Sequence, residues 1–166
     1  RELGCFHNCA TLRRRGSGGR KFVIAKATDA IKWLVNFMTV TMPYEGACHC
    51  GALQFRLNTR PPSALLRCNC SICELEDFLH WIMPLSHFEW ISGEANTYRF
   101  GSGVARHTFC PTCGVKPFYF PRSNPDGVSI NARCVPGLNW RALPVDEFDG
   151  QHWEQNAATL SHLSSE

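Results

Sequence analysis

The sequence contains Cys48-His49-Cys50-Gly51 and, further along, Cys110-Pro111-Thr112-Cys113-Gly114. Two cysteines separated by one or two residues in a turn can hold one zinc ion from the same side, because thiolates bind zinc in a tetrahedral cage. The glycine after each pair suits the backbone angles of such a turn. Joining the two pairs on one ion would tie distant strands together. We therefore predict a closed, structural zinc site at Cys48, Cys50, Cys110 and Cys113.

A third cluster, Cys68-Asn69-Cys70-Ser71-Ile72-Cys73, lies between these pairs. It offers three thiolates and no obvious fourth ligand nearby in the sequence. Catalytic zinc sites keep one position open for water or substrate, whereas structural sites are filled. We therefore predict a second, catalytic zinc at Cys68, Cys70 and Cys73. Two alternatives stay open: the trio shares one four-cysteine site with another pair, or it holds a metal for structure alone.

Three thiolates give the second site a particular chemistry. A zinc ion with three thiolates carries a net negative charge and is a poorer Lewis acid than zinc held by neutral imidazoles. Such a site is well suited to receive a fourth thiolate and to keep it deprotonated at neutral pH, where it can be presented to a small electrophile such as an aldehyde. The cysteine count thus indicates thiol chemistry.

The cysteine pattern also bears on the compartment. Seven of the ten cysteines lie in short clusters, and no signal-peptide pattern opens the chain. Closely spaced thiols chelate a metal more easily than they reach distant disulfide partners. We expect a reducing, cytoplasmic compartment and not the disulfide framework of a secreted protein.

Residues 1–43 form a basic N-terminal extension with eight Lys/Arg and two Asp/Glu, and we place one domain at 44–166. The domain has nine Lys/Arg and twelve Asp/Glu, so any attraction to nucleic acid would come from the extension. Charged residues interrupt the apolar run at 22–40, which excludes a membrane span. An Arg-rich start with a short amphipathic helix also resembles an organelle transit peptide, which is the alternative to a plain extension.

From Tyr44 onward, short apolar stretches alternate with turn residues, which predicts a mainly β fold. A tight hairpin loop is expected at 123–127. Asp149 is expected to cap a C-terminal helix at 150–163 that packs on a sheet. The expected strands are 52–57, 79–83, 88–92, 97–100, 105–109, 116–120 and 128–131.

The cysteine clusters and their flanking residues resemble the glutathione-dependent formaldehyde-activating enzyme family, which includes centromere protein V. The resemblance covers residues 44–155. The segments that carry it are Cys-His-Cys-Gly-Ala-Leu-Gln-Phe at 48–55, Cys-Asn-Cys-Ser-Ile-Cys at 68–73, Thr-Phe-Cys-Pro-Thr-Cys-Gly-Val at 108–115, Pro-Arg-Ser-Asn-Pro at 121–125, Asn-Ala-Arg-Cys at 131–134 and Phe-Asp-Gly-Gln-His-Trp at 148–153.

This resemblance implies the same partition into a four-cysteine structural zinc site and a three-cysteine second site. It also implies zinc-braced packed sheets similar to methionine-R-sulfoxide reductases and to a small Rab exchange-factor fold. The implied activity is a carbon-sulfur lyase reaction that adds glutathione to formaldehyde and gives S-hydroxymethylglutathione. A glutathione carrier, or a non-catalytic zinc module associated with chromatin or the cytoskeleton, is the alternative that the family also allows.

Several further residues are candidates for binding substrate. His80 could be a fourth ligand or a proton shuttle, and Arg122, Asn131 and Arg133 could hold glutathione carboxylates. For each of these a structural role is the competing interpretation. We expect His49 to face solvent and His107 to belong to a strand, while Cys134 is either a buried thiol or near the pocket. Cys5 and Cys9 receive no role. The acidic stretch 74–77 would oppose an anionic tripeptide if its carboxylates faced the site.

Overall fold

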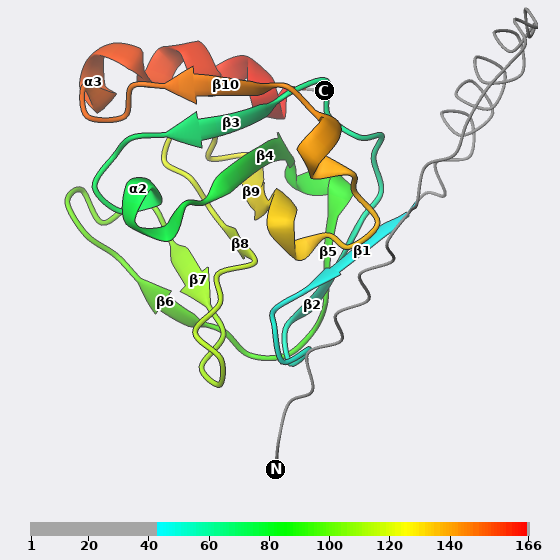
Figure 1. Cartoon of the computed structure of the whole chain (residues 1–166). Coiled ribbons are helices and arrows are strands. Elements are labelled where there is room, and N and C mark those ends of the chain that lie inside the picture. Colours follow the sequence, from blue (N-terminus) through cyan, green and yellow to red (C-terminus); the bar gives the residue numbers. More distant parts are fainter. Residues whose placement is uncertain (1–42, 166) are drawn as a thin grey trace, which may run out of the picture. The chain divides into compact units, whose positions relative to one another are not determined.

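The computed structural model describes residues 43–165, which form two main β-sheets and a separate two-stranded ribbon (Figure 1). The first sheet has the order β1-β2-β5, from β1 (Tyr44–Ala47), β2 (Gln54–Leu57) and β5 (Phe88–Ser92). The second has the order β10-β3-β4-β9-β8, from β3 (Leu65–Cys68), β4 (Leu79–Pro84), β8 (Phe118–Tyr119), β9 (Gly127–Asn131) and β10 (Val145–Phe148). The ribbon pairs β6 (Asn96–Tyr98) with β7 (His107–Phe109).

The main core lies between the two larger sheets. Alternate residues of β2 point inward, which buries Phe55 and Leu57, and the facing sheet contributes Trp81 and Phe118 among others. The rings of Phe55 and Phe118 meet edge to face with centroids 5.7 Å apart. Each fully buried large apolar side chain stabilises the fold by about 1.5–3 kcal/mol relative to exposure. The core therefore fixes the position of the turns that carry the cysteines.

β10 joins the edge of the second sheet and runs parallel to β3, while the other pairs in this sheet are antiparallel. The register sets Phe148 opposite Cys68. The segment after β10 consequently lies beside the loop that follows Cys68, although the two are far apart in sequence.

Short helical segments complete the fold: α2 (Cys73–Glu76), η1 (Leu85–His87), η2 (Ala132–Cys134), η3 (Trp140–Ala142), α3 (Trp153–Asn156) and η4 (Ala157–Ser164). The C-terminal helix expected at 150–163 exists only as the single turn α3 followed by the 3₁₀ segment η4, which packs against β4. The predicted cap is wrong. His152, not Asp149, is the N-cap residue, and the Asp149 carboxylate instead contacts the side chains of Asn69 and His152.

The mainly β prediction is confirmed, and each of the seven expected strands overlaps an observed one. The region expected to form a hairpin loop does join the antiparallel strands β8 and β9, but the connection is longer than the tight loop expected, because β8 ends at Tyr119 and β9 begins at Gly127. The sequence analysis missed β1, β3 and β10. The extension up to residue 42, with Cys5 and Cys9, lies outside the described residues. Within residues 43–165, no helix is long and apolar enough to cross a membrane.

Candidate metal centres and their cavity

Two similar turns carry the first and last cysteine pairs. The turn after β1 holds Cys48 and Cys50, and the turn after β7 holds Cys110 and Cys113. Gly51 and Gly114, one residue past each pair, have φ angles of 77° and 74°, the left-handed region that only glycine adopts without strain. Each of these glycine N–H groups donates to the carbonyl of the first cysteine in its pair, at 3.1 and 2.9 Å.

The four sulfur atoms of these pairs meet in one cluster. All lie within 4.8 Å of one another, with Cys50 Sγ 3.5 Å from Cys48 Sγ and 3.6 Å from Cys110 Sγ. A tetrahedral zinc ion with Zn–S bonds of about 2.3 Å has sulfurs roughly 3.8 Å apart, so the donor set fits this ion. The Leu53 N–H donates a hydrogen bond to Cys48 Sγ at 3.3 Å.

The second cluster forms where β3 ends and α2 begins. Cys68 is the last residue of β3, Cys73 is the first residue of α2, and Cys70 lies in the loop between them. Their three sulfurs lie within 4.8 Å of one another. Among residues 43–165, no His, Asp, Glu or further Cys ligand atom completes this group within the same distance. His80 is thus not a fourth ligand in this geometry.

Shared hydrogen bonds perturb the three thiols in opposite directions. Hydrogen bonds from Cys68 and Cys73 lower the pKa of Cys70 to about 2. The hydrogen bond between Cys68 and Cys70 raises the pKa of Cys68 to about 11, and the bond to Cys68 likewise raises the pKa of Cys73. Cys70 is therefore the thiol of the trio that deprotonates most readily. Zinc displaces thiol protons when it binds, so this donor set also fits zinc.

The segment after β10 closes over the trio. Asn69 lies between two of the cysteines, and its amide group contacts Asp149 Oδ1 at 3.2 Å and the N–H of Gln151 at 3.0 Å. Gly150 is thereby pressed against the cluster. A Cβ atom at this position would come within 2.4 Å of Cys68 Sγ, so only glycine leaves room for the sulfur.

A cavity of about 460 Å³ opens beside the second cluster, and all three of its cysteines line the wall. None of the four cysteines of the first cluster does. Much of the wall is apolar, and Arg122 is the one Lys or Arg on it among the described residues. Its largest apolar side chains are Leu66, Ile72, Ile82, Phe100, Phe148, Trp153 and Leu160.

Two buried histidines lie on the cavity wall with Tyr119. His80, on β4, places Nδ1 3.0 Å from Ser129 Oγ and 3.5 Å from the Tyr119 hydroxyl, while its Nε2 has no partner among the described residues. Burial lowers the pKa of His80 to about 4. Burial, with the charge of Lys116, lowers the pKa of His107 to about 4 as well. Both rings are therefore neutral at pH 7.

The other candidate substrate residues differ in position. Arg122 lies on the cavity wall, where it pairs with Glu154 at 2.7 Å and lies over the Trp153 ring. Asn131 and Arg133 do not line the cavity. Arg133 pairs with Asp77 on the surface and lies over Trp140, while Asn131 Oδ1 accepts the Arg133 N–H at 3.2 Å.

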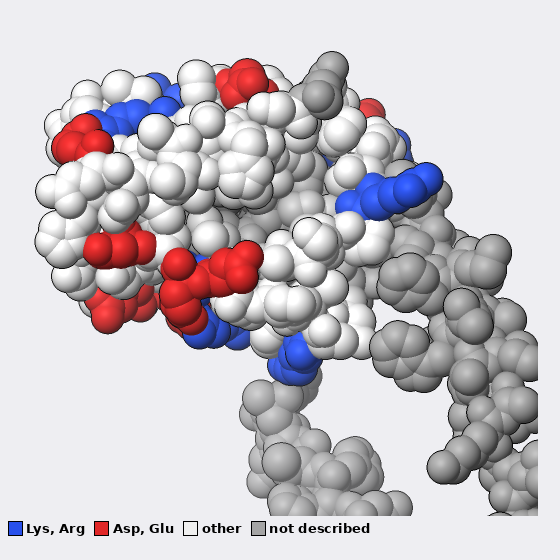
Figure 2. All heavy atoms as spheres, turned by 90° about the horizontal axis from the view of Figure 1, so that it is seen from above, with Lys and Arg blue, Asp and Glu red and all other residues white. Residues whose placement is uncertain are grey.

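None of the carboxylates of the acidic stretch lines the cavity. Glu76 pairs with Lys116, and Asp77 with Arg133. The carboxylates of residues 74–77 therefore do not face the cavity, so they do not repel an anionic tripeptide there. Figure 2 shows separate acidic patches and mostly uncharged atoms on the face seen from above, with no continuous basic surface on the described part of that face.

The remaining expected positions are also settled. His49 is exposed within its turn, and His107 belongs to β7, as expected. Cys134 packs against the main core, burial raises its pKa to about 11, and it does not reach the cavity. The sequence analysis did not identify Asn69, Lys116, Tyr119, Ser129 or Gly150, because their roles depend on partners far away in the chain.

The chain resembles known proteins. A crystal structure of a Rhodobacter sphaeroides protein, solved as a structural-genomics target, is 31% identical and superimposes with a TM-score of 0.56. The match covers 61% of this chain and 99% of that one. The model of the glutathione-dependent formaldehyde-activating enzyme family matches residues 43–144, which span both cysteine clusters, and the chain belongs to this family.

Proposed function

We propose that the protein is a carbon-sulfur lyase that adds glutathione or a similar thiol to formaldehyde or another small aldehyde. The observation that carries the proposal is the difference between the two cysteine clusters. The three-cysteine cluster opens into the 460 Å³ cavity, whereas the four-cysteine cluster does not line it. Membership of a glutathione-dependent family supports the same chemistry.

Each cluster would hold one zinc ion, structural at Cys48, Cys50, Cys110 and Cys113 and functional at Cys68, Cys70 and Cys73. Zinc at the second cluster, when bound, would lower the pKa of a thiol that takes the open position. The zinc-binding domain would comprise residues 44–166, with 1–43 as an extension outside it. A cytoplasmic location fits eight cysteines that are all free in the described part of the chain.

The chain's own residues would bind and orient the thiol. The apolar side chains of the wall would exclude water around the reacting sulfur and aldehyde carbon. Arg122 would bind a carboxylate of glutathione, since the guanidinium group forms paired hydrogen bonds with carboxylates. Glu154 competes for this arginine at 2.7 Å, so the affinity for an anionic thiol would be moderate.

The proposal is tested with Cys70→Ser, which removes one thiolate from the second cluster. The control is Cys134→Ser, because Cys134 lies outside both clusters and outside the cavity. Zinc content, glutathione binding by calorimetry and the rate of formaldehyde exchange with glutathione by NMR are measured for both variants. We expect Cys70→Ser to keep one zinc, to lose glutathione binding and to lose the accelerated exchange, while the control keeps all three properties.

Two results would count against the proposal. If wild-type protein binds glutathione without accelerating the exchange, the protein is a thiol carrier and not a lyase. If Cys70→Ser retains both binding and acceleration, the second cluster is not the reaction site.

A further inference from the structure

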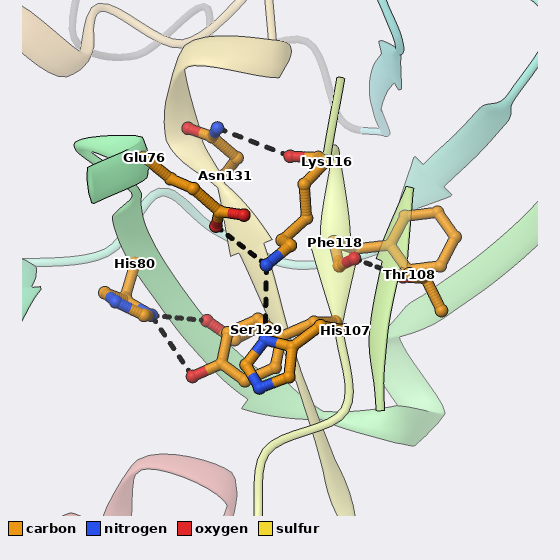
Figure 3. A network of polar contacts seen from close by, with 9 residues as sticks. Glu76, His80, His107, Thr108, Lys116, Phe118, Ser129 and Asn131 are labelled. Atoms are coloured by element: carbon orange, nitrogen blue, oxygen red, sulfur yellow. Dashed lines mark hydrogen bonds and ion pairs between the residues drawn. The ribbon is translucent and has the colours of Figure 1, made fainter. Parts of the chain in front are cut away.

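A buried lysine fixes the chemical form of one histidine in the cavity wall. Lys116 is only 8% exposed, and its Nζ lies 2.7 Å from Glu76 Oε2 and 3.2 Å from His107 Nδ1 (Figure 3). A lysine ammonium group can donate hydrogen bonds but cannot accept them. His107 Nδ1 must therefore accept, and a neutral imidazole that accepts at Nδ1 carries its proton on Nε2.

The His107 ring is also held in place. It stacks on Tyr119 with centroids 4.9 Å apart and planes 7° apart, and the Phe100 ring lies 5.3 Å from it. Only 4% of the residue is exposed. In Figure 3 the second ring nitrogen lies away from Lys116. A half-turn of the ring about χ2 would keep the stacking but would place Cδ2 where Nδ1 now lies, so it would lose the contact with the lysine.

The wall around His107 also carries the second cysteine cluster and a buried nitrogen without a partner among the described residues. His107 and the three cysteines line the same cavity, and the charge of Cys70 acts on the pKa of His107. His80 also contacts the Tyr119 ring, and its Nε2 is buried without a partner among the described residues. A buried polar atom without a partner destabilises the fold unless something binds it. A polar group of a ligand would satisfy it.

We infer that His107 is a catalytic residue whose Nε2–H donates a hydrogen bond to the oxygen of the bound aldehyde, and that Lys116 and Glu76 are positioning residues that fix this tautomer. The inference rests on the proposed function. In the reaction, the sulfur lone pair forms the S–C bond and the C=O π pair moves to oxygen. That oxygen takes up a proton from water, in place of the proton that the thiol released. His107 stabilises the charged oxygen and keeps its own proton.

The inference assigns a role to the acidic stretch after the trio. Glu76 lies on α2, which begins at the ligand Cys73, and its carboxylate offsets the charge of the buried Lys116. A basic residue at position 76 would repel Lys116 and loosen its contact with His107. The acidic character of this segment thus supports the cavity without facing it.

The functional test compares His107→Phe, which keeps an aromatic ring but no donor, with His107→Gln, which restores an N–H donor. Removing one donor to a developing oxyanion lowers kcat by roughly 10²- to 10³-fold. We expect this loss in His107→Phe with KM for the thiol little changed, and partial recovery in His107→Gln. If His107→Phe exchanges formaldehyde as fast as wild type, or if His107→Gln recovers nothing, the inference is wrong.

A second measurement separates this inference from the proposed function. Nitrogen-15 NMR of the labelled, zinc-loaded full chain distinguishes the two neutral tautomers of each histidine. We expect the Nε2–H form alone for His107 in the wild type, and a mixture in Lys116→Met. An Nδ1–H or charged His107 in the wild type would overturn the inference even if Lys116→Met failed to fold. Absence of catalysed exchange in the wild type, with the Nε2–H form present, would instead refute the lyase proposal.

Discussion

Gly150→Ala is expected to weaken zinc binding at the second cluster and to leave the first cluster intact. The new Cβ would lie 2.4 Å from Cys68 Sγ and 2.9 Å from Cys70 Cβ. Ordinary contacts between such atoms are about 3.5–4 Å, so the sulfur or the loop must move by roughly 1 Å. Zinc sites hold their ligands within about 0.2 Å of the ideal distance. In the variant, either the loop at Gly150 is strained or the Cys68 sulfur is displaced from its position as a zinc ligand.

The size of the effect follows from the cost of overpacking. Inserting an extra methyl group into a packed site costs about 1–3 kcal/mol. At about 1.4 kcal/mol per factor of ten, this cost corresponds to zinc affinity that is roughly 5- to 150-fold weaker at the second cluster. The first cluster lies in a different part of the fold, so its affinity is expected to stay the same.

The assay is competition with a chromogenic zinc chelator, which resolves two ions of different affinity. Gly137→Ala is the matched control, because a Cβ there would make an ordinary contact, 3.5 Å from Tyr44 Cδ1. We expect the control to release both zinc ions at the same chelator concentrations as wild type. Gly150→Ala should release the more weakly bound ion, that of the second cluster, at a lower chelator concentration, and the other ion as in wild type. Unchanged affinity for both ions in Gly150→Ala would show that Gly150 does not press on the zinc-binding cluster.

Three further outcomes are expected. Cys113→Ser should unfold the domain, because structural zinc contributes about 10–16 kcal/mol and a domain's net stability is about 5–15 kcal/mol. Thermal denaturation should then show no cooperative transition. A cooperative transition near the wild-type Tm would argue against a structural role for this cysteine. His80→Gln should flatten the loss of stability in acid, because the pKa of His80 drops from 6.5 to about 4 on folding. As pH falls from 6.5 to 4, the wild type should lose about 3 kcal/mol more unfolding free energy than the variant, and both should lose the share that comes from His107. Denaturant titration measures this difference, and parallel pH curves for the two proteins would refute it. Glu154→Gln should remove the ion pair that holds Arg122 and leave the arginine available to glutathione. Because an exposed ion pair is worth about 0.2–1 kcal/mol, glutathione binding should become roughly 2-fold stronger. Equal or weaker binding by calorimetry would contradict the role of Arg122.

The cysteine clusters could be predicted from sequence because their geometry is local. Spacings of one or two residues show which neighbouring sulfurs can bind one ion together, whereas the link between the first cysteine pair and the last joins turns sixty residues apart and needed the structure. The longer strands were also predictable, since each carries its own alternation or apolar run. β1, β3 and β10 were missed. β10 is defined by pairing with β3, far away in the chain, which a local pattern does not show.

The polar part of the cavity could not be predicted, because it depends on long-range partners. The pair between Glu76 and Lys116 joins residues 40 positions apart, and nothing in the sequence links the two. Arg133 and Asn131 were candidates for binding carboxylates. In the structure, however, Arg133 forms an ion pair with Asp77, and the Asn131 side-chain oxygen accepts a hydrogen bond from the Arg133 N–H. The Asp149 cap failed for the same reason, since Asn69 and His152 compete for that carboxylate.

The central claim is that two unequal zinc sites exist, one closed by four cysteines and one held by three at the cavity. Native mass spectrometry combined with zinc X-ray absorption tests it most directly. We predict two zinc ions per chain in the wild type, one with four sulfur ligands and one with three sulfurs and a lighter fourth ligand. Cys70→Ser should leave a single ion with four sulfurs. A wild-type chain that binds one zinc, or a second ion that also has four sulfur ligands from the protein, would contradict the account.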